Sequence, residues 1–419
     1  MMNLLAILAV LPLPQEIHVV DISGQGDFLQ VSDAIPLVAA GDLLLVQAGE
    51  YAGFELNGKG LSIVAHPEAT SAPRFTGTVR LSGLPPEERI VLNGLVVDEP
   101  TFENYLDAHV TALVLQNNDG SIRIQDCEFV AGEGLDFENA PPAAFVNGSS
   151  DLSINESTLQ GGAGLSSFGY AGGAPSPGGG DGLLMVDSRV SIHRSIVRGG
   201  NGGDLPNGGI GGSGGAGLRQ QSGRLYLSHS LVGGGDSGDT SDGVVLGFCT
   251  NGAPGLHVNP SAQASELGSI FLGGEAGIFT FSACTFGGDD GLPIDGDIVR
   301  FTEPPRAAIS PSIVRAGETF TTSYFGQPGD LATRLISMDP TWKWKPGRNG
   351  TLLVDQGTPL FVIHGFIGPV AGSFDVQESL SLPANMNFGT FYTQGMFISQ
   401  EGQTILANPE TITVLDPSF

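Results

Sequence analysis

The sequence predicts an all-β fold, a right-handed parallel β-helix with an N-terminal capping helix followed by a small antiparallel β-sandwich. Three observations predict it. A short apolar pattern recurs between Ile90 and Phe286, and a helix-then-strand segment precedes it. Near residue 304 the repeat stops and short strand-like segments separated by turn signals follow. Recurrence of one short unit is typical of repeat architectures, in which each unit buries its inner face only against its neighbours.

The repeat reads apolar-x-apolar-x-x-(Cys/Ser)-x-apolar. Its copies begin at Ile90, Ile122, Leu152, Val190, Leu225 and Phe279, and the small residue is Cys127, Ser157, Ser195, Ser230 and Cys284 in the copies that have one. Two apolar residues separated by one place both side chains on one face of a strand, and the gap that follows predicts a bend. Leu256 is expected to begin a further rung, which makes the 23-residue step to Phe279 the bare coil length.

The segment before the repeat has its own order of elements. Apolar residues at helical spacing predict a helix over Phe28–Ala40, and the turn Gly41-Asp42 leads into an apolar strand over Leu43–Val46. This order resembles the entry of the pectin-lyase-like β-helix superfamily, in which a helix caps the open end of the coil. The resemblance implies the fold alone, because that superfamily contains lyases, hydrolases, esterases, adhesins and inert scaffolds.

Length and the ends of the repeat predict the domain organisation. The 419 residues are expected to divide into a signal peptide over residues 1–15, the β-helix over 16–304 and a β-sandwich over 305–419. The apolar run Leu4–Leu11 is too short to span a bilayer, so export without membrane insertion is expected. After residue 305, turn signals every 8–15 residues resemble the Ig-like or β-sandwich modules that end many bacterial surface proteins.

The charge of the chain limits its partners. The formal net charge is −27, from 17 basic and 44 acidic residues, which argues against nucleic acid and anionic membranes. It suits a secreted, periplasmic or cell-surface protein, and we expect a monomer. The partner expected is an acidic or cell-surface polysaccharide.

Arginines and tryptophans supply the candidate ligand-binding residues. Arg189 and Arg224 each precede the first apolar residue of a rung, so they are expected about 4.8 Å apart on consecutive coils. Arg194 and Arg198 add charge to the same coil, and together these arginines could hold carboxylates or sulfates. The alternative is that each arginine pairs with a nearby Asp such as Asp187 or Asp204.

The only two tryptophans, Trp342 and Trp344, lie two residues apart and are expected on one face of a strand. They could stack on sugar rings, or they could form the sandwich core or its seam with the β-helix.

Catalytic and metal-binding candidates are weaker. Asp289 and Asp290, with Arg300 behind them, form the densest acidic cluster, but the motifs of pectin hydrolases, lyases and methylesterases are missing. The sequence therefore favours no catalytic residues. Gly-rich stretches at Gly161–Gly180 and Gly199–Gly217 predict projecting loops with few side chains to order them. Asp204, Asp236 and Asp239 are candidates for Ca²⁺, and no other cofactor is expected.

The sequence thus predicts an exported, non-catalytic β-helix protein for surface attachment or polysaccharide binding. One alternative is a polysaccharide lyase or glycoside hydrolase acting on an acidic polysaccharide. The other is a structural spacer of the cell envelope with no ligand.

Overall fold

The structure is a computed structural model that describes residues 15–98, 110–134, 138–166, 176–205, 210–241, 250–281, 284–304, 306–345, 348, 350–355, 361–367, 372–380, 387–417 and 419. Almost all regular structure in these residues is β-strand, much of it in long parallel sheets, so the predicted all-β class is confirmed. The expected signal segment lies outside the described residues except for Gln15. No helix of the described part is long and apolar enough to span a membrane.

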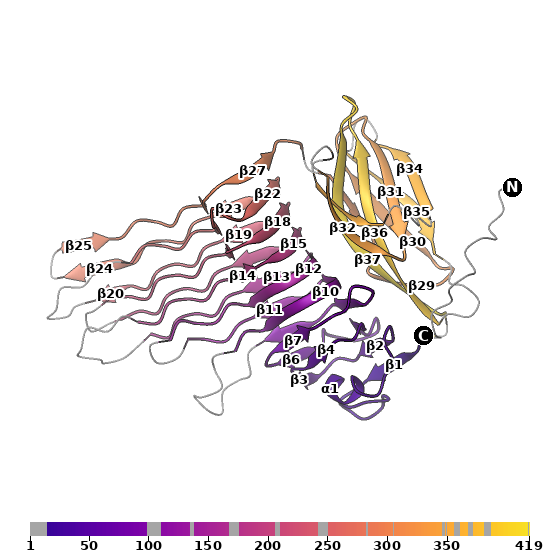
Figure 1. Cartoon of the computed structure of the whole chain (residues 1–419), viewed down its shortest axis with the longest axis horizontal. Coiled ribbons are helices and arrows are strands. Elements are labelled where there is room, and N and C mark those ends of the chain that lie inside the picture. Colours follow the sequence, from indigo (N-terminus) through magenta and orange to yellow (C-terminus); the bar gives the residue numbers. More distant parts are fainter. Residues whose placement is uncertain are drawn as a thin grey trace.

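Residues 17–301, here called the parallel region, form three faces around one interior (Figure 1). Face 1 comprises β4 (Glu55–Asn57), β7 (Val79–Ser82), the first parts of β10 (Leu113–Gln125) and β12 (Ala144–Asn155), β14 (Leu183–Val186), β17 (Leu218–Gln220), β21 (Leu256–Val258) and β26 (Ile294–Asp295). Face 2 comprises β1 (Ile17–Val20), β2 (Leu43–Val46), β5 (Ser62–Ala65), β8 (Arg89–Asn93), the last parts of β10 and β12, β15 (Ser188–His193), β18 (Gly223–Ser228), β22 (Gln263–Leu267) and β27 (Ile298–Phe301).

Face 3 is a separate parallel sheet made of β3 (Glu50–Ala52), β6 (Arg74–Thr76), β9 (Val96–Asp98), β11 (Glu128–Val130), β13 (Thr158–Gln160), β16 (Ile196–Arg198), β19 (Leu231–Gly233) and β23 (Ile270–Leu272). The chain passes from face 1 to face 2 to face 3 in each repeat, and every strand pairs with its counterpart in the next repeat. The apolar residues of the sequence pattern, such as Ile122, Ile124 and Phe129, point into the shared interior and are fully buried.

The predicted N-terminal helix is much shorter than expected. Within the described residues, α1 covers only Val31–Ala34, and turns follow it up to Ala40. Val31 and Ala34 are buried in the interior of the parallel region, and Ile35 packs against it. The helical spacing of the sequence therefore predicted correctly which residues face the interior. It overestimated the length of the helix.

The bend between faces 2 and 3 explains the Cys/Ser position of the repeat. Each Ser hydroxyl donates to the carbonyl two residues earlier, as Ser195 does to His193 at 2.7 Å, and accepts the N–H of the preceding repeat, as from Ser157 at 3.1 Å. The residue just before it has a positive φ in successive repeats: Gly94, Asp126, Glu156, Arg194, His229 and Gly268. A small hydroxyl residue is thus selected because it satisfies backbone groups that the left-handed bend frees.

Two of the expected rungs are wrong. The pairing places Ala264 after Leu225 and Ile298 after Ala264, whereas Leu256 pairs with Leu218 on face 1. The copy that begins at Phe279 is an antiparallel hairpin of β24 (Ile278–Phe281) and β25 (Cys284–Gly287), joined by β20 (Thr240–Ser241). The bare coil length is also shorter than 23, since Ser62 pairs with Leu43, 19 positions earlier.

The Gly-rich stretches form ordered stacked arms in their described parts. In the repeats from β11 onward the chain leaves face 3, runs outward and returns to face 1, and the described parts of these arms lie side by side in Figure 1. The N–H groups of Gly199, Gly202 and Leu205 donate to the next outward arm at 2.8–2.9 Å, while Gly200 donates to the returning arm at Gly180. A three-residue period of this kind is that of an extended threefold helix. The described parts of these stretches are thus ordered by bonds between backbones, with few side chains involved, and the order itself was not predicted from the sequence.

Residues 307–415, here called the antiparallel region, form two facing sheets and a ribbon. One sheet contains β28 (Ala307–Ile309), β30 (Thr319–Phe325) and β35 (Ser373–Ser379); the other contains β29 (Ile313–Arg315), β37 (Thr404–Leu415), β36 (Phe388–Ile398), β31 (Leu331–Ser337) and β34 (Phe361–Phe366). The ribbon is β32 (Pro340–Lys345) and β33 (Gly350–Val354). Tyr324 and Phe397 pack between the sheets, and the region lies against face 2 (Figure 1).

Close approach of the arms predicts which glycines are essential. A Cβ added at Gly200 would lie 1.8 Å from the Gly162 carbonyl oxygen, whereas one at Gly233 would meet nothing closer than the Arg198 Cγ at 3.8 Å. We expect Gly200→Ala to lower the free energy of unfolding by roughly 2 kcal/mol or more, and Gly233→Ala to change it by less than about 0.5 kcal/mol. Chemical denaturation measures both, and equal effects would contradict the backbone-ordered arms.

Candidate functional site

An open cleft of about 720 Å³ lies where the ribbon β32–β33 meets face 2. It gathers four basic side chains and both tryptophans of the chain, with one carboxylate, and its lining residues are Asp187, Ser188, Arg189, Gly223, Arg224, Gln263, Trp342, Lys343, Trp344 and Lys345. On a chain of net charge −27 such a gathering of cations is a local inversion of the surface charge. The cleft is therefore the candidate binding site.

The predicted arginine pair is confirmed by the strand register. Arg189 in β15 pairs directly with Arg224 in β18, so their side chains leave face 2 at neighbouring positions. Arg189 is exposed and makes no ion pair or hydrogen bond within the described part of the chain. Arg224 receives its only described support from Gln263, whose Oε1 accepts from Nη2 at 2.6 Å. Within the described ranges neither guanidinium pairs with a carboxylate, which leaves both available to an anion.

The opposite wall of the cleft comes from β32. Trp342 donates from Nε1 to the Ser191 hydroxyl at 3.0 Å, and the Trp344 ring meets Tyr226 edge-on at 5.7 Å between centroids. Both tryptophans thus belong to the seam between the two regions, as one of the sequence alternatives held, and they remain half-exposed at the cleft. Lys343 has a distant partner in Asp355 at 3.9 Å, and Lys345 has no partner among the described residues.

Arg194 and Arg198 do not join the cleft. Arg194 occupies the left-handed position of the bend, and its Nε donates to Glu156 at 2.8 Å. Arg198 is in β16 on face 3 and lines a different hollow of about 650 Å³, together with Glu133, Asp236 and Glu275. The expected four-arginine patch is therefore reduced to Arg189 and Arg224, because the bend turns the chain away after His193.

The acidic cluster predicted as a weak catalytic candidate shows no catalytic arrangement in its described contacts. The Asp289 N–H donates to Asn251 Oδ1, and Asp290 accepts the N–H of Ala276, so both are part of the stacked arms. Arg300 faces Glu266 at 3.8 Å, on β27 of face 2. The Asp290 carboxylate thus serves a backbone donor, and Arg300 is placed beside Glu266 on a different face.

The calcium candidates have the same structural role. Asp204 Oδ1 accepts the N–H of Asp239, Asp239 Oδ1 accepts the N–H of Ile278, and Asp236 Oδ1 accepts the N–H of Glu275. Each side chain satisfies the outward N–H of the neighbouring arm, which the three-residue period leaves unpaired. Among the described residues, no group of three or more His, Cys, Asp or Glu side chains is placed to hold a metal.

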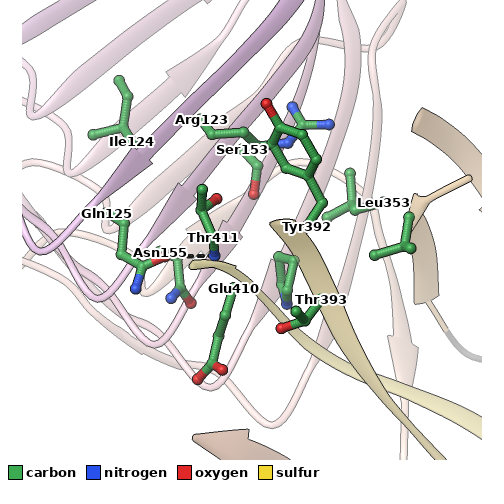
Figure 2. Close-up of a pocket in the computed structure, with 12 residues that line it drawn as sticks. Arg123, Ile124, Gln125, Ser153, Asn155, Leu353, Tyr392, Thr393, Glu410 and Thr411 are labelled. Atoms are coloured by element: carbon green, nitrogen blue, oxygen red, sulfur yellow. Dashed lines mark hydrogen bonds between the residues drawn. The ribbon is translucent and has the colours of Figure 1, made fainter. Parts of the chain in front are cut away.

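A polar seam holds the antiparallel region on face 2 beside the cleft. Arg123 bonds both carboxylate oxygens of Asp151 at 2.8 and 3.0 Å and lies 5.9 Å from the centre of the Tyr392 ring. Gln125 Oε1 accepts the N–H of Thr411 at 2.9 Å, as Figure 2 shows. Bonds to such buried groups fix the position of one region on the other, since breaking them leaves polar groups unpaired.

Two titratable groups near the seam are strongly perturbed. Burial lowers the pKa of His193 to about 3, and its Nδ1 lies 2.8 Å from the Ser228 hydroxyl. Burial also raises the pKa of Glu410 to about 7, although Arg334 lies 3.7 Å away. Both groups are enclosed rather than exposed in the cleft, so they bear on stability and not on ligand chemistry.

Lys343, Lys345 and Gln263 are among the lining residues that the sequence analysis did not name as site residues. Lys343 and Lys345 alternate with the tryptophans, and this alternation was a usable signal, since a strand that approaches a cleft can offer both faces to it. Gln263 gave no signal, because the apolar residue that follows it is Ala264, which does not match the repeat.

No protein-family model and no curated protein matches the chain. Among solved structures it is similar to a superoxide reductase (neelaredoxin) from Ignicoccus hospitalis, with 12% identity and a TM-score of 0.16 over 26% of this chain and 80% of that one. It is also similar to the enzymatically active domain of tailspike protein 4 of bacteriophage CBA120, with 10% identity and a TM-score of 0.20. That match covers 92% of this chain but 65% of the tailspike domain, under two thirds of its length. At such TM-scores neither likeness carries a conclusion.

The buried His193 predicts a pH-dependent stability. An unfolded histidine takes up a proton near pH 6.5, whereas the folded group does so only near 3, so stability is full above pH 6.5 and is lost as pH falls below it. Asn155 occupies the equivalent position one repeat earlier, which makes His193→Asn a conservative change. The wild type should lose about 2 kcal/mol of unfolding free energy between pH 7.5 and 5 because of His193, and His193→Asn should not show this loss. Urea unfolding at both pH values measures it, and an unchanged pH slope would refute this assignment.

Proposed function

We propose that the parallel region is a right-handed parallel β-helix. Its three faces around one interior support this, as does the strong preference of parallel crossover connections for the right hand. In this proposal α1 and the turns after it cap the N-terminal end, as in the pectin-lyase-like superfamily that the N-terminal segment resembles. A cap protects the first strand edge from pairing with other chains.

The function that the cleft supports best is the binding of an anionic polysaccharide. The observation that carries it is the convergence of Arg189, Arg224, Lys343 and Lys345 with two half-exposed tryptophans in one open cleft. Guanidinium groups bind carboxylate and sulfate oxygens, and indole faces bind the apolar faces of sugar rings.

The cleft favours binding over hydrolysis. Glycosidases need two carboxyl groups that flank the scissile bond at about 5–10 Å. Among the described residues that line the cleft, Asp187 is the one carboxylate, and it accepts a hydrogen bond from the Ser222 hydroxyl at 2.6 Å. We therefore propose a non-catalytic role in attachment to a polysaccharide surface.

The acidic remainder of the chain fits an exported protein that acts at the cell surface as a monomer. A net charge of −27 disfavours nucleic acid and anionic membranes as partners, because both would be repelled everywhere except at the cleft. The local positive charge would then select one anionic segment of a polysaccharide.

The arginine pair gives the direct test. Arg189→Ala/Arg224→Ala should weaken binding to acidic polysaccharides, presented as a panel of polyuronates and sulfated glycans, by at least about tenfold, because two charge-assisted contacts are lost. Binding of the wild type should also fall as salt rises. Affinity electrophoresis followed by calorimetry on the strongest probe measures both effects.

Arg194→Ala is the matched control, since Arg194 lies on the same strand–bend unit but is paired with Glu156 outside the cleft. It should bind as the wild type does. Absence of binding to every acidic glycan would sink the proposal in favour of a structural spacer, and release of unsaturated or shortened products would favour an enzyme.

A further inference from the structure

The cleft has a pattern of charge along the stacking axis that restricts its ligand. At the first outward position of face 2, Arg189 pairs with Arg224 and Arg224 with Gln263. Asp151 and Asp297 extend this column, since each directly precedes a residue, Leu152 or Ile298, that pairs in the same register. Because the strands pair in register, these residues form one ladder whose steps are about 4.8 Å. The ladder runs from negative through two positive rungs to neutral and then negative again.

At the Asp151 end the ladder is covered. Asp151 is buried and held by Arg123 through two hydrogen bonds, beneath the antiparallel region that covers this part of face 2. A ligand that lies on Arg189 therefore cannot extend toward Asp151. It must leave the cleft there or end.

At its other end the ladder stays open but loses its positive charge. Gln263 binds Arg224 through its Oε1, and Asp297 follows in an adjoining hollow of about 320 Å³. That hollow is walled by Ile298, Val299 and Trp344, and the Val299 side chain is well exposed. Apolar walls of this kind suit the face of a neutral sugar, whereas Asp297 disfavours a second anion.

We propose that the site takes a glycan in which an acidic residue is followed by a neutral one, and discriminates against a chain of uninterrupted uronates. This inference rests on the anionic-polysaccharide binding proposed above and names its ligand class. The acidic group lies across Arg189 and Arg224, and the neutral neighbour lies against Trp344 and Val299. A polyuronate would bring a further carboxylate toward Asp297, two steps beyond Arg224, where like charges repel.

The test compares two octasaccharides of equal length at one ionic strength. Hyaluronan octasaccharide alternates glucuronate with N-acetylglucosamine, and octagalacturonate carries a carboxylate on every residue. Titration calorimetry of the full chain should show at least fivefold tighter binding of the alternating glycan. Asp297→Asn should tighten binding of octagalacturonate at least threefold and change binding of the hyaluronan probe by less than twofold.

Asp295→Asn is the matched control, since it removes the same charge two residues away, where Asp295 pairs with His257 outside the lining of the cleft. It should leave the preference unchanged. Equal or tighter binding of octagalacturonate by the wild type, or the same gain from both variants, overturns this inference and leaves the proposed function standing. If neither octasaccharide and no member of the wider acidic panel binds, both proposals are overturned.

Discussion

The in-register stacking of parallel strands is the constraint on which the rest of this structure depends. Because each strand pairs with its counterpart in the next repeat, every position of the repeat becomes a column of like-placed side chains. One column of hydroxyls satisfies the bend, one column of apolar residues fills the interior, and one column places Arg189 beside Arg224. Each bond in such a column contributes little alone, on the order of 1 kcal/mol, but repetition makes the whole cooperative.

The same constraint acts on the arms, where side chains have almost no part in the packing. The arms approach so closely that a Cβ at Gly200 or Gly215 would meet a carbonyl oxygen at 1.8–2.0 Å. Glycine is therefore required by contact between backbones, and the remaining outward N–H groups are satisfied by Asn and Asp side chains such as Asn201 and Asp236. The acidity of this surface thus has a structural cause, which weakens any interpretation of its aspartates as metal ligands.

The cleft exists because the antiparallel region covers only part of face 2. It is held over β8, β10 and β12 by Val91, Arg123 and Gln125, and it leaves the next two arginines uncovered beside β32. The tryptophans serve both purposes, since each is anchored in the seam and still offers part of its ring to the cleft. Binding and docking are therefore coupled, and substitutions at Trp342 or Trp344 would disturb both.

The sequence by itself determined the all-β class, the inward residues of five repeats from Ile90 to Leu225, and the pairing of Arg189 with Arg224, because a local period dictates which side chains share a face. The repeat predicted at Phe279 was wrong because an antiparallel hairpin shows the same local alternation of apolar residues as a rung of the coil. Only the tertiary structure decided that the glycine arms stack, that Gln263 and Asp297 continue the arginine ladder, and that two lysines and two tryptophans complete the cleft. These depend on contacts between residues that lie far apart in the chain, up to 151 positions for Trp342 and Ser191, which no local pattern encodes.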